Sequence, residues 1–131
     1  MIVLDTHAWL WWLHEPARLS SRARTAIEEA EASRSLRVST ISVWEVAIKV
    51  ASGKLALPMD LDTWFGRAQS YPGIELVSVD ARDALESTRL PGSFHRDPAD
   101  RLIVALARRH GAPLVTRDQR IRDYGHVTSI W

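Results

Sequence analysis

The sequence predicts an α/β fold in which helices cover both faces of a central, mainly parallel sheet. Short apolar runs typical of buried strands alternate with amphipathic helical patterns from one end of the chain to the other. This alternation indicates parallel strands, because a crossover between parallel neighbours needs a long connection, usually a helix. The 131 residues suit one domain and contain no repeat or long linker, so we expect a single domain over residues 1–131.

Five apolar runs are the expected strands. Each is only a few residues long and carries mainly Val, Ile and Leu, as strands buried on both faces do. The runs are residues 2–4, 36–39, 74–77, 113–116 and 127–130.

Helical patterns fill the intervals between these runs. They are expected at 6–14, 20–32 and 42–52, from 60 to 70, from 80 to about 89, and over 98–110. Three of them begin at a typical N-cap: Ser20, Asp60 and Asp80. The last helix has the clearest ends, with Asp97 at the N-cap, Pro98 at the first helical position and Gly111 just beyond the end.

Composition excludes several classes of protein. The chain has no Cys, which excludes a disulfide scaffold and a thiolate metal site and fits a reducing compartment. No apolar run approaches the roughly 20 residues that span a bilayer. Asp5 interrupts the N-terminal apolar run too early for a signal peptide. We therefore expect a cytoplasmic protein that has no contact with a membrane.

The basic residues are mostly arginine, although the formal net charge is only +1. There are 15 Arg against 2 Lys, and seven of the Arg lie between Arg96 and Arg122. The planar guanidinium matches phosphate oxygens, so an Arg-rich face is suited to a nucleic-acid backbone. Arginines that only solvate helix faces are the alternative interpretation, and composition alone leaves both open.

Several carboxylates follow the expected strands or begin the helices after them. They are Asp5, Glu45, Asp97, Asp100 and Asp118. Ligands of open parallel sheets bind at the carboxyl ends of the strands, so these acids are candidates for one site. Two such charges 4 Å apart repel by ~4 kcal/mol at an effective dielectric of 20, which calls for a cation. Oxygen ligands without Cys or paired His favour Mg²⁺ or Mn²⁺ over Zn²⁺.

Most of these acids also have an ordinary structural explanation. Glu45 fits a capping box that begins at Ser42. N-cap, first-turn or turn positions explain the three later acids. Asp5 is the exception, because Thr6 is itself a natural cap for the following helix. Capping and metal binding are compatible, since a helix N-terminus adds positive potential beside the anions.

Five short segments occur in an order and at spacings that are specific together. They are Ile-Val-Leu-Asp-Thr-His at 2–7, Ser-Val-Trp-Glu-Val at 42–46, Gly-Lys-Leu-Ala-Leu-Pro at 53–58, His-Arg-Asp-Pro-Ala-Asp-Arg-Leu-Ile at 95–103 and Leu-Val-Thr-Arg-Asp at 114–118. With these segments the chain resembles a PIN-domain ribonuclease, and it is most similar to the VapC-type toxins of toxin–antitoxin pairs. The resemblance runs over essentially the whole chain.

The resemblance implies a PIN-like α/β/α sandwich and an endoribonuclease that depends on Mg²⁺ or Mn²⁺. It makes Asp5 and Asp100 the principal metal-binding acids, Asp118 the acid that completes the pocket, and Glu45 the one that shapes it or holds a second metal. These four are the expected catalytic residues, and Asp97, Thr116 and Thr6 are expected to support them. The expected reaction is in-line attack of a metal-activated water on an RNA phosphodiester, leaving a 5′-phosphate and a 3′-hydroxyl.

Substrate and partners are expected around this pocket. Arg96, Arg101 and Arg117 each lie next to or near a site acid, and we expect them to contact RNA phosphates. A salt bridge that holds the acids in place is the alternative for each. The resemblance also implies a homodimer and a cognate VapB-type antitoxin whose tail covers the acidic pocket.

The N-terminal helix carries three of the six Trp residues of the chain. Trp9 and Trp12 share a face that suits the core, whereas Trp11 points elsewhere. Trp11 is therefore expected to face a protein partner or to stack on unpaired bases. The resemblance favours the protein partner. His7 and His95 are the two histidines next to candidate site acids.

The main alternative is a PIN-like module that binds RNA or protein without cutting it. Such a module would be expected to lack one or more of the acids. All of them are present, so the sequence favours the nuclease.

Overall fold

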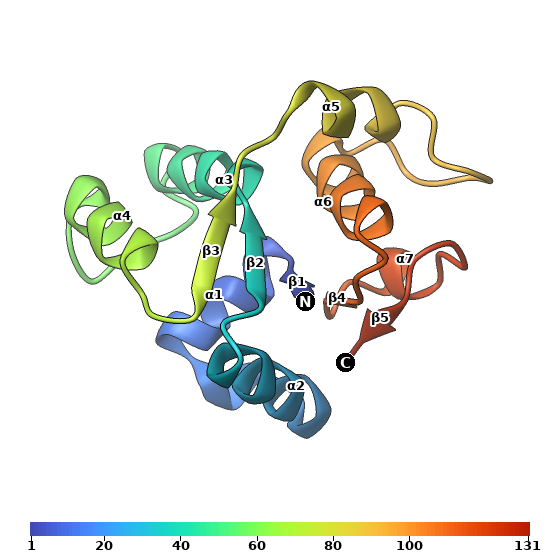
Figure 1. Ribbon diagram of the computed structural model, residues 1–131. Helices are drawn as coiled ribbons and strands as arrows, with labels where there is room; N and C mark the ends of the chain where they lie inside the picture. The colour runs from blue at the N-terminus through green and yellow to red at the C-terminus, as the bar shows by residue number, and fades with distance from the viewer.

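The computed structural model describes residues 1–131 and contains one sheet with helices on both of its faces (Figure 1). The strands are β1 (Ile2–Leu4), β2 (Leu36–Ser39), β3 (Ile74–Val77), β4 (Leu114–Val115) and β5 (Ser129–Ile130). Their order is β3-β2-β1-β4-β5, and every neighbouring pair is parallel. The predicted α/β class with a central parallel sheet is confirmed.

The helices connect these strands and lie on the two faces of the sheet. They are α1 (Thr6–His14), α2 (Ser21–Ala32), α3 (Thr40–Ala51), α4 (Leu61–Gln69), α5 (Ala81–Ser87), α6 (Pro98–Arg109) and α7 (Gln119–Arg122). A short 3₁₀ turn at Pro16–Arg18, which the sequence did not predict, joins α1 to α2.

Alternating side chains of the central strands build a core on each face of the sheet. On β1, Leu4 packs with α1, α2 and α4, whereas Val3 packs with α6 and α7 on the opposite face. On β4, Val115 and Leu114 divide in the same way. This division follows from the two-residue period of a strand, which places successive side chains on opposite faces.

Two predicted details of the start of α3 are wrong. Helix α3 begins two residues early, because Ser39 is its N-cap and accepts a hydrogen bond from the Ile41 N–H at 3.3 Å. Ser42 is therefore buried inside the helix, and the predicted capping box between Ser42 and Glu45 does not form. The capping box of this chain joins Asp80 and Asp83 at the start of α5.

The order of the strands reverses between β1 and β4. The chain first adds β2 and β3 on one side of β1 and then returns to add β4 and β5 on the other side. The two central strands end together, since the Asp5 N–H donates to the Val115 carbonyl at 3.1 Å. In open parallel sheets, this reversal creates a crevice at the carboxyl ends of the strands.

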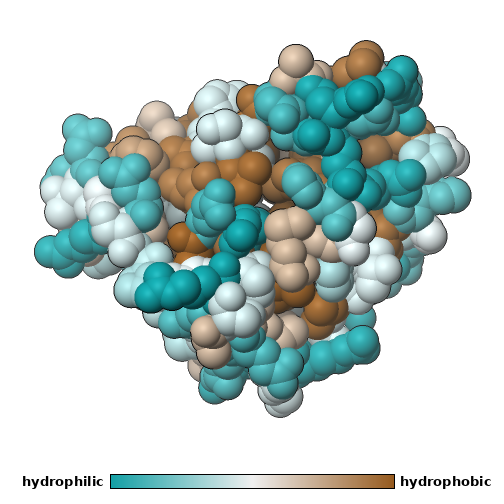
Figure 2. Space-filling view, in the orientation of Figure 1, coloured by the Kyte–Doolittle hydropathy of each residue, from teal (hydrophilic) through white to brown (hydrophobic).

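The surface of the molecule is mixed. On the face shown in Figure 2, hydrophilic residues cover most of the outer helices and hydrophobic residues are visible mainly in the seams between elements. None of the helices has both the length and the apolar character needed to cross a lipid bilayer.

Candidate active site

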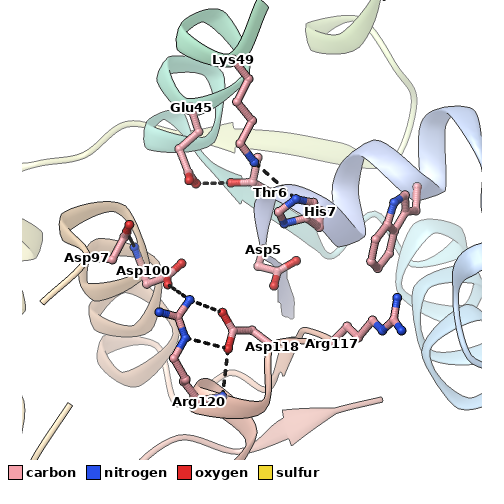
Figure 3. Close-up of a pocket in the computed structure, with 11 residues that line it drawn as sticks. Asp5, Thr6, His7, Glu45, Lys49, Asp97, Asp100, Arg117, Asp118 and Arg120 are labelled. Carbon is pink, nitrogen blue, oxygen red and sulfur yellow. Dashed lines mark hydrogen bonds and ion pairs between the residues drawn. The ribbon is translucent and has the colours of Figure 1, made fainter. Parts of the chain in front are cut away.

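A cavity of about 490 Å³ opens at the carboxyl edge of the sheet, beside the ends of β1 and β4. The first turns of α1 and α6, the middle of α3 and the segment after β4 form its wall. The predicted acids line it together: Asp5, Glu45, Asp97, Asp100 and Asp118. In Figure 3, Asp97 and Asp100 belong to one helix, the other three carboxylates come from separate elements, and Asp5 lies in the middle of the group.

Asp5 is held where β1 passes into α1. It is the N-cap of α1, and its Oδ1 accepts a hydrogen bond from the Ala8 N–H at 2.8 Å. The expectation that Thr6 caps this helix is wrong, because Thr6 is already the first helical residue. Asp5 therefore caps a helix and lines the pocket while only 6% of its surface is exposed.

Thr6 connects α1 to Glu45 on α3. Its hydroxyl donates to Glu45 Oε1 at 2.5 Å and lies 2.8 Å from the Ser42 hydroxyl. One helical turn further along α3, the Lys49 ammonium lies 3.3 Å from His7 Nε2. These contacts fix the orientation of Glu45 and place Lys49 at the rim of the pocket.

Asp97 and Asp100 belong to the first turn of α6. Asp97 is the N-cap, and its Oδ1 accepts from the Asp100 N–H at 2.9 Å, as the sequence predicted for this cap. The Asp100 side chain contacts His95, whose Nε2 lies 2.6 Å from Asp100 Oδ2. Both side chains of this pair are largely buried. His95 therefore holds Asp100, and Asp97 holds the helix from which Asp100 projects.

Asp118 lines the pocket from the segment after β4 and is the N-cap of α7. The Arg120 guanidinium contacts both of its oxygens, with Nη2 2.9 Å from Oδ2. The same Nη2 is 3.7 Å from Asp100 Oδ2, so Arg120 bridges two pocket acids (Figure 3). Thr116 supports this loop by accepting from the Asp118 N–H at 3.0 Å.

The electrostatics separate Asp5, Glu45 and Asp100 from Asp118. Burial raises the pKa of Asp5 to about 7, and the charges of Asp100 and Asp118 add to this effect. Burial also raises the pKa of Glu45 and of Asp100, against the hydrogen bonds from Thr6 and His95. The hydrogen bond from Arg120 instead lowers the pKa of Asp118. Burial thus makes the charged forms of Asp5, Glu45 and Asp100 unfavourable.

The chemistry of this donor set fits a hard divalent cation. Five carboxylates line the pocket against three basic side chains, Lys49, Arg117 and Arg120, and buried carboxylates favour neutralisation by a proton or a cation. No three His, Asp or Glu side chains already stand together as a cation site. Asp118 and Asp100 turn partly toward Arg120, and Glu45 turns toward Thr6. The metal site therefore stays a prediction.

The three arginines expected to contact substrate lie in different places. Arg117 lines the pocket, whereas Arg96 does not. Arg101 also lies outside the lining, and its guanidinium donates to the backbone carbonyls of Ser87, Phe94 and His95. These bonds make Arg101 a brace for the loop before α6.

Two basic residues of the pocket were not singled out by the sequence. Lys49 reaches the rim from α3, and Arg120 pairs with Asp118. Lys49 lies one helical turn after Glu45, and Arg120 two residues after Asp118. The four-residue spacing between Glu45 and Lys49 is a signal that would have placed Lys49 near a site acid, because such residues share a helix face. Residues two apart do not face each other on a helix, so no comparable signal pointed to Arg120.

Comparisons with known proteins agree with this geometry. A family model described as the PIN domain matches residues 2–127. Ribonuclease VapC22 of Mycobacterium tuberculosis is 38% identical over 132 residues, which cover 99% of this chain and 98% of the relative.

Solved structures show the same fold at lower identity. One is VapBC2 from Rickettsia felis bound to a DNA fragment from its promoter. It matches with a TM-score of 0.69 and 16% identity, covering 98% of this chain and 97% of that chain. DNA-bound VapBC from Salmonella typhimurium matches with a TM-score of 0.68 and 14% identity, over 98% of this chain and 97% of that chain.

Proposed function

The chain belongs to the PIN-domain family, and on that basis we propose that it is a toxin-type endoribonuclease that uses a divalent cation held in the acidic pocket. The observation that carries the proposal is the position of Asp5. It lies at the reversal point of the sheet, buried among acids from three other elements, with its pKa raised to about 7. A full-length relative at 38% identity is named a ribonuclease, which supports the same reaction class.

The residues that would hold the cation are Asp5 and Asp100, with Asp118 and Glu45 on the adjoining walls. Mg²⁺ or Mn²⁺ bound there would polarise a phosphate oxygen and make a water molecule more acidic. His95 and Thr6 keep Asp100 and Glu45 in place for this purpose. Asp97 supports the same arrangement through the first turn of α6.

The chain's own groups then serve the hydrolysis of an RNA phosphodiester. Glu45, whose pKa is raised by burial, or Asp118 accepts a proton from the attacking water. The water oxygen forms the new bond to phosphorus while the bond to the 3′-oxygen breaks. The 3′-oxygen leaves with the electrons of that bond and takes a proton from solvent, so the products carry a 5′-phosphate and a 3′-hydroxyl. Lys49 and Arg117 at the rim bind phosphate oxygens of the RNA backbone.

The proposal includes a VapB-type antitoxin and a second copy of the chain as partners. The antitoxin is supported by the structural relatives, which include a toxin–antitoxin complex and DNA-bound VapBC complexes. The second copy of the chain rests on the family resemblance alone. The antitoxin tail would cover the acidic pocket and keep RNA away from it.

The test is RNA cleavage by purified protein free of antitoxin, with Mg²⁺, Mn²⁺ or EDTA. The matched pair of variants is Asp5→Asn and Asp60→Asn, because each residue is an N-cap and Asn caps a helix as well as Asp. We expect metal-dependent cutting that is lost only in Asp5→Asn. Cleavage by folded Asp5→Asn at the wild-type rate would overturn the assignment, and a folded wild-type protein that neither binds metal nor cuts RNA would favour the non-catalytic module.

A further inference from the structure

A second cavity, of about 650 Å³, adjoins the acidic pocket. Three residues line both cavities, namely His7, Trp11 and Lys49. The second cavity runs between the outer side of α1 and the segment 54–58 after α3. We refer to it as the α1 groove.

The α1 groove differs from the acidic pocket in charge. Arg18, Lys49 and Lys54 line it, and its single acid, Glu15, lies 3.6 Å from the Arg18 guanidinium. Five of its twelve lining residues are hydrophobic. A strand of RNA has the matching chemistry, because its phosphates need cations and its bases need apolar or aromatic surfaces. The acidic pocket alone would repel that strand.

Trp11 stands at the junction of the two cavities and is only partly buried. The Arg18 guanidinium carbon lies 4.9 Å from the centre of its ring, and that of Arg117 lies 5.9 Å from it. The ring of Trp131 supports Trp11 at 5.9 Å between centroids. Guanidinium planes and nucleobases occupy aromatic faces in the same way. The guanidinium groups of Arg18 and Arg117 therefore lie against the Trp11 ring, where a stacked base would lie.

We propose that Trp11 and the α1 groove bind unpaired nucleotides of single-stranded RNA beside the scissile phosphate. One base stacks on Trp11, and Arg18 and Lys49 contact the adjoining phosphates. This subsite rests on the proposed function, because it lies beside the scissile phosphate only if the acidic pocket cleaves RNA. Trp11 lines both the groove and that pocket. It selects single-stranded over double-stranded RNA, since a paired base has no free face for the indole.

The test measures RNA binding in EDTA, so that neither metal nor cleavage enters the result. The probes are a fluorescent oligouridylate of about twelve nucleotides and an abasic ribose-phosphate strand of the same length. The variants are Trp11→Leu and Trp11→Phe. The control is Trp44→Leu, because Trp44 is 54% exposed and lines neither cavity. Thermal unfolding checks that each variant is folded.

We expect the wild type to bind oligouridylate more tightly than the abasic strand, and we expect this difference in affinity to depend on Trp11. Trp11→Leu should weaken binding of oligouridylate by roughly 10-fold and leave the abasic strand within about twofold of wild type. Trp11→Phe should retain most of the affinity, since Phe still stacks, and Trp44→Leu should change nothing. Arg18→Gln should reduce the salt dependence of binding by about 0.7 in slope, the value for one phosphate of a single strand.

Two results would overturn the subsite. One is an equal loss of affinity for oligouridylate and for the abasic strand in Trp11→Leu, because a general disturbance of the surface would weaken the binding of both. The other is unchanged binding of both strands in folded Trp11→Leu and Arg18→Gln, which would assign the groove to a protein partner instead. These outcomes can be told apart from failure of the proposed function. If the wild type cleaves RNA but RNA binding does not depend on Trp11, only the subsite is overturned. If binding depends on the bases and on Trp11 but no RNA is cleaved, only the nuclease is overturned.

Discussion

The two ends of α6 each contact a group of carboxylates at helix N-termini, and they differ in what balances the negative charge. At the C-terminal end, Arg109 pairs with Asp80 at 3.0 Å and with Asp83. Hydrogen bonding within the capping box, together with Arg109, lowers the pKa of Asp80. At the N-terminal end, burial raises the pKa of Asp100, and that of Asp5 nearby.

The comparison shows that a cap and a functional site are not exclusive explanations of an acid. Asp5, Asp80 and Asp118 are all N-caps, so the role in the helix does not distinguish them. What distinguishes Asp5 is buried negative charge without an adequate basic partner. Such charge is costly for folding and is retained where a cation or a reaction needs it.

The largest expected difference between the two groups is in catalysis. Asp100→Asn should reduce RNA cleavage by at least about 100-fold, because it removes a carboxylate of the proposed cation site. Asp80→Asn should leave cleavage per folded molecule unchanged, since Asn keeps the cap and Asp80 lies outside the pocket. Initial rates on one RNA substrate measure both. Equal losses in the two variants would remove the distinction between the groups.

The next difference is in the pH dependence of stability without metal. Folding raises the pKa of Asp5 from 3.8 to about 7. Between these values the folded state binds more protons than the unfolded state, so this group's contribution to stability falls as the pH rises. Asp5→Asn should remove that fall. The free energy of unfolding of the variant, minus that of wild type, should therefore rise by about 2–4 kcal/mol between pH 4 and pH 8.

Urea unfolding of both proteins in EDTA at several pH values measures this effect. The lowered pKa of His7 acts in the opposite direction near neutral pH, but it is common to both proteins and cancels in their difference. A difference that does not change between pH 4 and pH 8 would contradict the buried, unbalanced state of Asp5.

The smallest expected difference concerns the two arginines. Arg120→Gln should change the free energy of unfolding by less than about 1 kcal/mol, because its side chain is 62% exposed. Arg109→Gln should destabilise the fold more, since it leaves Asp83 without a basic partner while 4% of that side chain is exposed. Unfolding midpoints of the two variants give the comparison. A larger loss in Arg120→Gln would mean that Arg120 is the structural brace.

The sequence predicts the arrangement of the acids better than it predicts their partners. Asp5 and Asp118 follow central strands, and the topology of a parallel sheet then brings them to one edge. The partners depend on the directions of long side chains. Arg101 follows Asp100 in sequence, but consecutive residues of a helix do not face each other, and it contacts backbone carbonyls instead.

Local competition between caps explains the other differences. Ser39 and Ser42 are both suitable caps for α3, and the end of β2 selects Ser39. Glu45 is thereby released from the predicted capping box and contacts Thr6 on α1. A contact between residues on separate helices follows from packing, which periodicity and motif spacing do not describe.

The most direct test of the central claim is Mn²⁺ binding, measured by calorimetry on the purified chain without RNA. We expect wild-type protein to bind Mn²⁺ and Asp5→Asn to lose at least about 10-fold in affinity, while Asp80→Asn matches wild type. Equal Mn²⁺ affinity in all three proteins, or no binding by the wild type, would contradict the claim that the acids around Asp5 form a cation site.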